Sequence, residues 1–190
     1  IRRALSSATL RDEEMAFHLQ PDSSYQSNYW EGRSCTAPAA SRIVKETLSA
    51  LGPITKAAEY GCGRWGTLYN MLLPEELRSV WHQYDINAAY VHQNKEFTNG
   101  RGPRADVTVG NLYQMSHPNE SLDLVVGLSA WDAIYGFEDA MSETFRVLKP
   151  GGAFVHFQDL WPDLGPLIAI EGAARLRNKP SRRMNGYPVI

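Results

Sequence analysis

Apolar stretches of two kinds alternate along the chain. Short, nearly unbroken apolar runs, of which 122–128 is the clearest, are typical of buried parallel strands. Stretches such as 38–51 place apolar residues three or four positions apart, which predicts amphipathic helices. Because the two kinds alternate, we expect an α/β fold: a three-layer, mostly parallel sheet with helices on both faces, joined by right-handed crossovers.

The same pattern places the individual elements. Strands are expected at about 54–60, 80–84, 105–109, 122–128 and 153–158. Helices are expected at about 38–51, 67–73, 88–97 and 137–148. Nearer the C-terminus, residues 167–177 could form another helix and residues 187–190 could begin one more strand.

Length and composition suit a single domain. The chain has 190 residues, of which 43% are hydrophobic and 21% are charged, so it can bury a sizeable core. We expect residues 36–190 to form this domain and residues 1–35 to form a polar arm or cap. Tyr25, Tyr29 and Trp30 in that arm either pack on the core or form a lid over a ligand pocket.

Charge and cysteine content exclude several classes of protein. A formal net charge of −2 gives no global field that would attract nucleic acid or an anionic membrane. Cys35 and Cys62 make neither a disulfide framework nor a metal-ligand spacing, as expected for free thiols in a reducing cytosol. No apolar run approaches the roughly 18 residues that span a bilayer. We expect a cytoplasmic protein, in a processed or trimmed form because it begins with Ile1, and its oligomeric state stays open.

A glycine-rich stretch between the first strand and the next helix is the candidate site. Gly61, Gly63 and Gly66 form a Gly-x-Gly-x-x-Gly pattern. Glycine can adopt positive φ and lets a ligand lie against its backbone, and the following helix would offer unpaired N–H groups. Strand, glycine turn and helix in this order indicate a nucleotide site, although an ordinary tight turn can carry the same glycines.

Four further motifs stand in order along residues 36–160: Glu59-Tyr-Gly-Cys-Gly63, Tyr84-Asp-Ile86, Gly110-Asn-Leu112 and Arg146-Val-Leu-Lys-Pro-Gly-Gly152. Together they resemble the motifs of class I, Rossmann-like S-adenosylmethionine-dependent methyltransferases. The last motif is the most specific, because nucleotide-dependent dehydrogenases do not usually carry it. The resemblance implies S-adenosylmethionine as the cofactor and S-adenosylhomocysteine as the product.

The resemblance also assigns roles to single residues. Glu59 would pair with the cofactor's ammonium, directly or through water, unless it makes a structural hydrogen bond in the turn. Asp85 would accept from both ribose hydroxyls, unless it caps the following helix. The cofactor-binding residues implied are Glu59, Gly61, Cys62, Gly63, Asp85, Ile86, Gly110, Asn111, Leu112 and Ser129.

The chain departs from the family at two places. Asn111 stands where the family often has aspartate, but its side-chain oxygen can still accept from the adenine amino group, and the Leu112 N–H can reach a ring nitrogen. Ile86 and Leu112 would enclose the adenine or belong only to the core. The family's sheet usually ends in antiparallel strands, and only about 30 residues follow Asp159, so we expect those strands to be short or missing.

The methyl acceptor should approach at the carboxyl ends of the fourth and fifth strands, where open α/β sheets bind ligands. Transfer in this family is a direct in-line displacement. Asp159 is a candidate base or polar anchor, or a turn residue. His156 is a candidate base, or a buried and hydrogen-bonded histidine. Trp131 would flank the transferred methyl group, or pack against a helix.

The acceptor itself is predicted by elimination. Ser129-Ala-Trp-Asp132 stands where nucleic-acid amino-methylating enzymes carry an Asn/Asp-Pro-Pro-aromatic tetrad. We therefore expect methylation of O or N on a small molecule, without a nucleic acid, membrane or metal partner. The alternatives are a protein methyltransferase, a non-catalytic methyltransferase-like binding subunit and, supported by the glycine spacing alone, an NAD(P)-dependent oxidoreductase.

Overall fold

A computed structural model of the chain describes residues 37–98, 106–128, 130–131, 134 and 136–157, together with the backbone of three short strands nearer the C-terminus. The expected N-terminal arm with Tyr25, Tyr29 and Trp30 lies outside the described residues. The division of the chain into an arm and one domain therefore stays a prediction.

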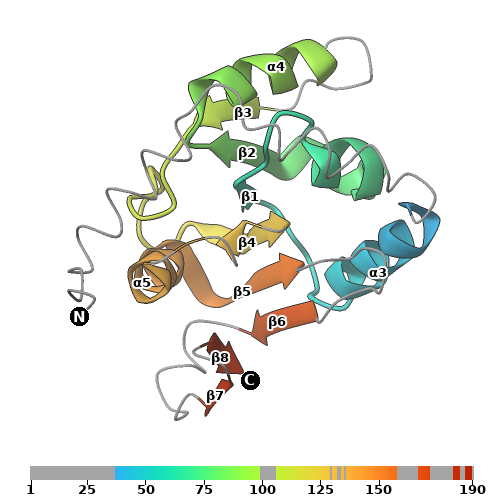
Figure 1. Cartoon of the computed structure of the whole chain (residues 1–190). Coiled ribbons are helices and arrows are strands. Elements are labelled where there is room, and N and C mark those ends of the chain that lie inside the picture. The colour runs from blue at the N-terminus through green and yellow to red at the C-terminus, as the bar shows by residue number, and fades with distance from the viewer. Residues whose placement is uncertain are drawn as a thin grey trace, which may run out of the picture.

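One six-stranded sheet organises the described part of the chain, in the order β3-β2-β1-β4-β5-β6 (Figure 1). The first five strands in this order are parallel, and β6 pairs antiparallel with β5. The strands are β1 Ala57–Tyr60, β2 Trp81–Asp85, β3 Asp106–Val109, β4 Leu122–Leu128, β5 Leu148–Phe157 and β6 Leu167–Glu171. A separate antiparallel pair is formed by β7 Arg182–Met184 and β8 Tyr187–Val189.

Helices cover both faces of this sheet, as the sequence predicts. Because strand side chains alternate between faces, Leu124 and Val126 of β4 belong to one core with Val44, and Val125 belongs to a second core with Met141. Figure 1 shows α3 and α5 on opposite sides of the sheet. The helices are α3 Ala37–Ser49, the π-helix η2 Leu68–Leu72, the 3-10 helix η3 Glu75–Val80, α4 Ala88–Thr98 and α5 Phe137–Val147. The three-layer, mostly parallel fold is confirmed.

Two expectations near the C-terminus need separate comment. The helix expected at 167–177 is wrong in its first part, because Leu167–Glu171 is the strand β6. Such a short apolar run does not distinguish strand from helix by its period, and the edge of β5 offers it hydrogen-bonding partners. An antiparallel strand after β5 is thus present and short, and the strand expected near residue 187 is confirmed as β8.

Strand β5 begins earlier than the sequence predicts, at Leu148 instead of residue 153. Its pairing with β4 shifts in register between Leu122 and Leu124, so the Pro-Gly-Gly segment is a bulge and not a break. Gly151 has a φ of 84°, and a Cβ at Gly152 would lie 3.0–3.2 Å from three carbonyl oxygens. Glycine is therefore required for the strand to continue through this segment.

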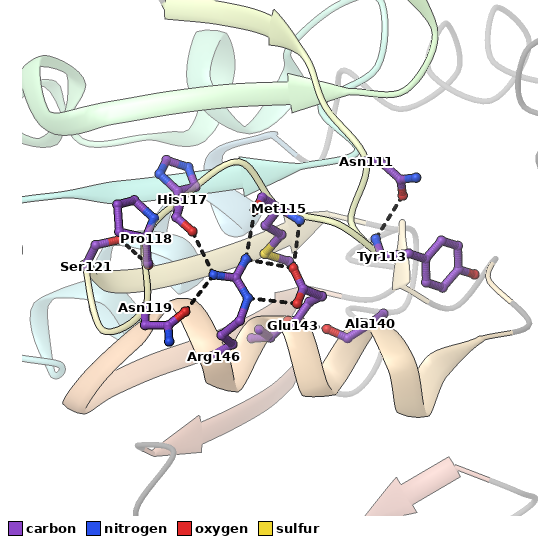
Figure 2. A network of polar contacts seen from close by, with 11 residues as sticks. Asn111, Tyr113, Met115, His117, Pro118, Asn119, Ser121, Ala140, Glu143 and Arg146 are labelled. Atoms are coloured by element: carbon purple, nitrogen blue, oxygen red, sulfur yellow. Dashed lines mark hydrogen bonds and ion pairs between the residues drawn. The ribbon is translucent and has the colours of Figure 1, made fainter.

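Arg146 fastens α5 to the loop before β4 (Figure 2). Its guanidinium donates to the carbonyl oxygens of Met115 at 2.8 Å and His117 at 2.9 Å, and to the Asn119 side chain at 2.9 Å. It also forms a two-bonded ion pair with Glu143, at 2.8 Å for each bond. Only the planar five-donor guanidinium can serve all these acceptors at once. The first residue of the most specific motif thus has a structural role.

We expect Arg146→Lys to lower the free energy of unfolding by about 1–3 kcal/mol, because an ammonium group leaves at least two of these acceptors without a charged donor. Urea unfolding of the purified protein measures this change. Arg42→Lys, on an exposed position of α3, serves as the control and should leave stability unchanged. Equal stability of R146K and wild type would contradict the role assigned to the guanidinium.

His117 makes a second, pH-dependent contribution to stability. Its ring packs edge-on against Tyr84 at 5.2 Å and Tyr60 at 6.4 Å between centroids. Burial, together with the charges of Lys56, His82 and Arg146, lowers the pKa of His117 from 6.5 to about 4. The unfolded chain therefore takes up a proton at a higher pH than the folded one, so this contribution to stability is lost as pH falls from 6.5 towards 4.

We expect His117→Phe, which keeps a ring in this cluster, to gain stability relative to wild type on acidification. The gain between about pH 7.5 and 5 should be roughly 1–2 kcal/mol, since the variant has no imidazole to protonate on unfolding. Urea titrations at the two pH values measure it. His92→Gln, at a side chain that is 75% exposed, is the matched control. The interpretation fails if the stability difference between H117F and wild type is independent of pH.

Candidate cofactor and active site

The glycine loop follows β1 and has the backbone that its sequence predicts. Gly61, Gly63 and Gly66 have φ values of 79°, 64° and 51°, in the left-handed region that favours glycine. A Cβ at Gly61 would collide with Ala130 after β4, which is a further reason for glycine here, and contact of its backbone with a ligand stays a prediction. The following helix differs from the expected one, since η2 is a five-residue π-helix.

Three successive N–H groups of the loop are bonded to the end of β2. Those of Gly61 and Cys62 donate to the Tyr84 carbonyl oxygen at 2.8 and 3.1 Å. That of Gly63 donates to the Asp85 carboxylate at 2.8 Å. Phosphate-binding loops instead present free N–H groups to the anion. These three residues therefore hold the loop in place and do not form a phosphate site, which argues against the dinucleotide alternative.

Asp85 is the point at which the predicted site segments meet. Its side chain accepts from the N–H groups of Gly63 and Asn87, and its carbonyl oxygen accepts from Gly110 at 2.9 Å. A carboxylate has four lone-pair sites, and acceptance of the ribose hydroxyls by Asp85 stays a prediction. The cap of α4 is supplied by Asn87, whose side-chain oxygen accepts from Ala89 and Tyr90 at 3.0 and 3.4 Å.

Glu59 is a buried carboxylate with partners on the neighbouring strand. It is 1% exposed, and one oxygen accepts from the Trp81 indole at 3.0 Å and from the Gln83 amide at 2.8 Å. The pKa of Glu59 is raised to about 7. Burial is the main cause and the Asp85 charge adds to it, while the two hydrogen bonds act in the opposite direction. A structural hydrogen bond is thus present, made to β2 and not within the turn, while pairing with an ammonium stays a prediction.

The turn after β3 brings the adenine motif to the same edge of the sheet. A Cβ at Gly110 would lie 2.7 Å from the Tyr84 ring, so the close approach requires glycine. The Asn111 side-chain oxygen accepts from the Tyr113 N–H at 2.8 Å (Figure 2). It has a second lone pair for another donor. Ile86 and Leu112 are half-buried, and their contact with adenine stays a prediction.

Cys62 has the surroundings of a packing residue. Its side chain is buried and its sulfur accepts from the Asn94 amide at 3.4 Å. Burial, with the nearby charges of Asp85 and Glu59, raises the thiol pKa well above its ordinary value. A thiol held in its neutral form is a poor nucleophile. The described residues contain no His, Cys, Asp and Glu group that could hold a metal ion.

The described acceptor-side residues are deep in the core. His156 in β5 is 4% exposed, and Trp131 is 1% exposed and packs against Phe154 with 4.7 Å between ring centroids. A Cβ at Gly127 would strike the Trp131 ring. Burial fits the packing alternatives for both residues, and their roles in transfer stay predictions. Ser129 and Asp159 lie outside the described residues.

Sequence reasoning missed the residues that support this site, namely Trp81, Gln83, Asn87 and Asn94. One signal for Gln83 exists: parallel pairing of β1 with β2 places it opposite Glu59, and Trp81 shares its face because strand side chains alternate. Nothing in the α4 sequence marks Asn94, because its partners Cys62 and Gly63 come from a distant segment.

Among the described helices, none is long and apolar enough to cross a membrane.

A parallel sheet with a glycine turn after β1, an acidic residue closing β2 and an adenine-type turn after β3 defines the class of S-adenosylmethionine-binding methyltransferase domains. Residues 58–156, just over half of the chain, match the model of the family described as "Methyltransferase domain". The chain belongs to this family.

Individual relatives agree with this assignment. The chain is 29% identical over 130 residues to a probable S-adenosylmethionine-dependent methyltransferase of Mycolicibacterium smegmatis, covering 68% of this chain and 45% of the relative. It is 28% identical over 125 residues to 24-methylenesterol C-methyltransferase 2 of Oryza sativa subsp. japonica, covering 63% and 34%. The matched region thus spans less than half of either relative's length.

A solved structure shares the fold. It is geranyl diphosphate C-methyltransferase from Streptomyces coelicolor, in complex with Mg²⁺, geranyl diphosphate and S-adenosyl-L-homocysteine. The TM-score is 0.51 at 18% sequence identity, covering 64% of this chain and 45% of that chain. At this identity the likeness concerns the fold alone.

The buried Glu59 carboxylate predicts a proton linkage to ligand binding. A cationic ammonium beside Glu59 would lower its pKa below about 7. We therefore expect S-adenosylhomocysteine to bind with release of a proton near neutral pH, and its affinity to rise between about pH 6 and 8. Calorimetry in buffers of different ionisation enthalpy measures the released proton.

The matched variants isolate this group. Glu59→Gln should abolish proton release, and Glu75→Gln, at an exposed position of η3, should not. In the ligand-free protein the raised pKa also makes this group's contribution to stability fall as pH rises from 4.5 towards 7. Proton release that persists in folded E59Q would show that the ammonium lies elsewhere.

Proposed function

We propose that this chain catalyses S-adenosylmethionine-dependent methyl transfer to a small-molecule acceptor by direct in-line displacement. The observation that carries the proposal is the chemistry at the end of β2. There, the N–H donors of Gly61, Cys62 and Gly63 are already engaged, and the Asp85 carboxylate lies beside the loop. Such a site favours a ligand with hydroxyl donors and positive charge over a pyrophosphate.

The residues present fit this cofactor. Asp85 offers two oxygens at the end of a parallel strand, the place where dinucleotide folds bind ribose hydroxyls. Glu59 lies beneath the same loop as a carboxylate that would gain a counter-charge. Asn111 and Leu112 supply an acceptor and a half-buried apolar surface for the adenine. These residues provide partners for the ribose, the ammonium and the adenine of the cofactor.

Bound S-adenosylmethionine supplies a methyl group that is already activated by the sulfonium. The protein's contribution is to hold the acceptor atom in line with that group, and well-oriented reactions of this kind gain large effective molarities. A base is needed only where the acceptor must lose a proton. Because His156 is buried in β5, we assign the role of base for such acceptors to Asp159 in preference to His156.

Two kinds of acceptor atom are candidates. The sequence favours O or N of a small molecule, by elimination of the nucleic-acid enzymes. A second candidate, a carbon atom of an electron-rich alkene, is favoured by the names of the relatives, because sterol and 24-methylenesterol C-methyltransferases recur among them at 26–34% identity. The non-catalytic and protein-methylating alternatives have no comparable support.

Cofactor binding tests the first part of this proposal. We expect Asp85→Ala to weaken S-adenosylhomocysteine binding by about 1–3 kcal/mol, because the ribose hydroxyls lose a buried acceptor. Titration calorimetry measures the change. Asp106→Ala removes an exposed carboxylate from the neighbouring strand β3 and should bind as the wild type does. No binding by the folded wild type would contradict the proposal, and unchanged affinity in D85A would place the ribose elsewhere.

Methyl transfer tests the second part. The protein is incubated with methyl-labelled cofactor and, separately, with metabolite extracts, sterol alkenes, phenols and amines. Carbon-13 NMR of the product then distinguishes a C-methyl from an O-methyl or N-methyl group. Cofactor binding without transfer to any small molecule, but with label in added protein, would favour the protein methyltransferase alternative.

A further inference from the structure

Asn94 lies behind the glycine loop, on the helix that follows β2. It is 0% exposed, and its side-chain amide donates to the Gly63 carbonyl oxygen at 3.2 Å and to the Cys62 sulfur at 3.4 Å. We propose that Asn94 is a positioning residue of the cofactor site, which fixes the glycine loop in the shape that receives the ligand. The inference rests on the cofactor class alone and not on the identity of the acceptor.

Gly63 is held from both sides. Its N–H donates to the Asp85 carboxylate at 2.8 Å, and its carbonyl oxygen accepts from Asn94. Glycine is the residue with the most backbone freedom, and ordering it costs the most conformational entropy. With both of its polar groups bonded, Gly63 is ordered before a ligand arrives. The loop then loses little further freedom on binding, which favours affinity.

The third glycine of the motif makes room for this side chain. A Cβ at Gly66 would lie 2.7 Å and 2.8 Å from the two polar atoms of Asn94, and 2.9 Å from the Asn70 amide. Gly66 also has a φ of 51°. Gly66 and Asn94 are therefore packed against each other, and the Asn94 side chain is one of the reasons, with Asn70 and the positive φ, why this position requires glycine.

The same helix ties the loop to the ribose-binding carboxylate. Asn87 at the start of α4 donates its N–H to Asp85 at 2.9 Å. Asn94 follows seven residues later, two helical turns along the same face. Because Asn87 and Asn94 are on one helix, α4 contacts both residues that the Gly63–Asp85 hydrogen bond joins. A change at Asn94 should therefore alter ligand affinity and not only stability.

Two variants of Asn94 and one control test the proposal. Asn94→Asp keeps the volume and removes the amide donor, and Asn94→Ala removes both. Thr144→Ala is the control, because Thr144 is equally buried and hydrogen-bonded but belongs to α5. Titration calorimetry with S-adenosylhomocysteine and urea unfolding are measured on each protein.

We expect both Asn94 variants to bind S-adenosylhomocysteine about tenfold or more weakly, while T144A loses stability and keeps the wild-type affinity. Adding Gly66→Ala to N94A should weaken binding by less than Gly66→Ala does alone, because the collision with Asn94 has been removed. Affinity of folded N94A and N94D within about twofold of wild type would overturn the proposal.

Hydrogen exchange on the wild-type protein gives a test that does not depend on any variant folding. The Gly63 amide should be protected in the ligand-free protein and should gain little further protection with S-adenosylhomocysteine. A Gly63 amide that exchanges freely until the ligand is added would show that the ligand, and not Asn94 with Asp85, orders the loop.

Discussion

The hydrogen bonds at the carboxyl end of β2 are the interaction on which the rest of the site depends. Tyr84 and Asp85 use two carbonyl oxygens and one carboxylate to bind the glycine loop, the start of α4 and the turn after β3. These three segments are far apart in the sequence, and the end of β2 is a partner that they share. Without this strand end, the first three motifs would be present but would not form one surface.

The parallel sheet makes this arrangement possible because it places the carboxyl ends of β1, β2 and β3 side by side at one edge. It also forces charged groups into the interior. Glu59 is buried because its strand is central. Hydrogen bonds from Trp81 and Gln83 replace those that water would make to its carboxylate. A buried carboxylate without a counter-charge is costly. A cationic ligand beside it would relieve part of that cost. The burial of Glu59 would therefore also favour a cationic ligand over a neutral one.

The sequence was sufficient wherever a local pattern determined the outcome. The apolar run of β4 and the positive-φ glycines at 61 and 63 were predicted because their signals are contained in a few neighbouring residues. The start of β5 was missed because Pro-Gly-Gly normally ends an element, and only pairing with β4 shows that it is a bulge. The apolar start of the segment at 167–177 was read as helix because its period is ambiguous, and the partner strand decided it.

The site was less predictable than the fold for the same physical reason. Motif residues that repeat within the family could be assigned, but Gln83 and Asn94 have meaning only through residues brought to them by folding. His156 and Trp131 were assigned from residue type and position in the sequence, and the structure adds that both are buried, Trp131 against Phe154 of β5. Residue type indicates what a side chain can do, and tertiary pairing decides whether it is free to do it.

Three N–H groups of the glycine loop are already bonded to the end of β2, and this affects which parts of the chain can select the cofactor and which the acceptor. Because the N–H groups of Gly61, Cys62 and Gly63 are bonded to β2, we expect these residues to recognise a ligand through shape, with the carboxylates of Glu59 and Asp85 and the adenine turn beside them. A pyrophosphate at the end of β2 would meet the Asp85 carboxylate where it needs donors, so this part of the site disfavours it. Cofactor choice is in this view a property of β1, β2 and the start of α4. The acceptor is left to the ends of β4 and β5, a separate part of the chain that can vary without disturbing the cofactor site.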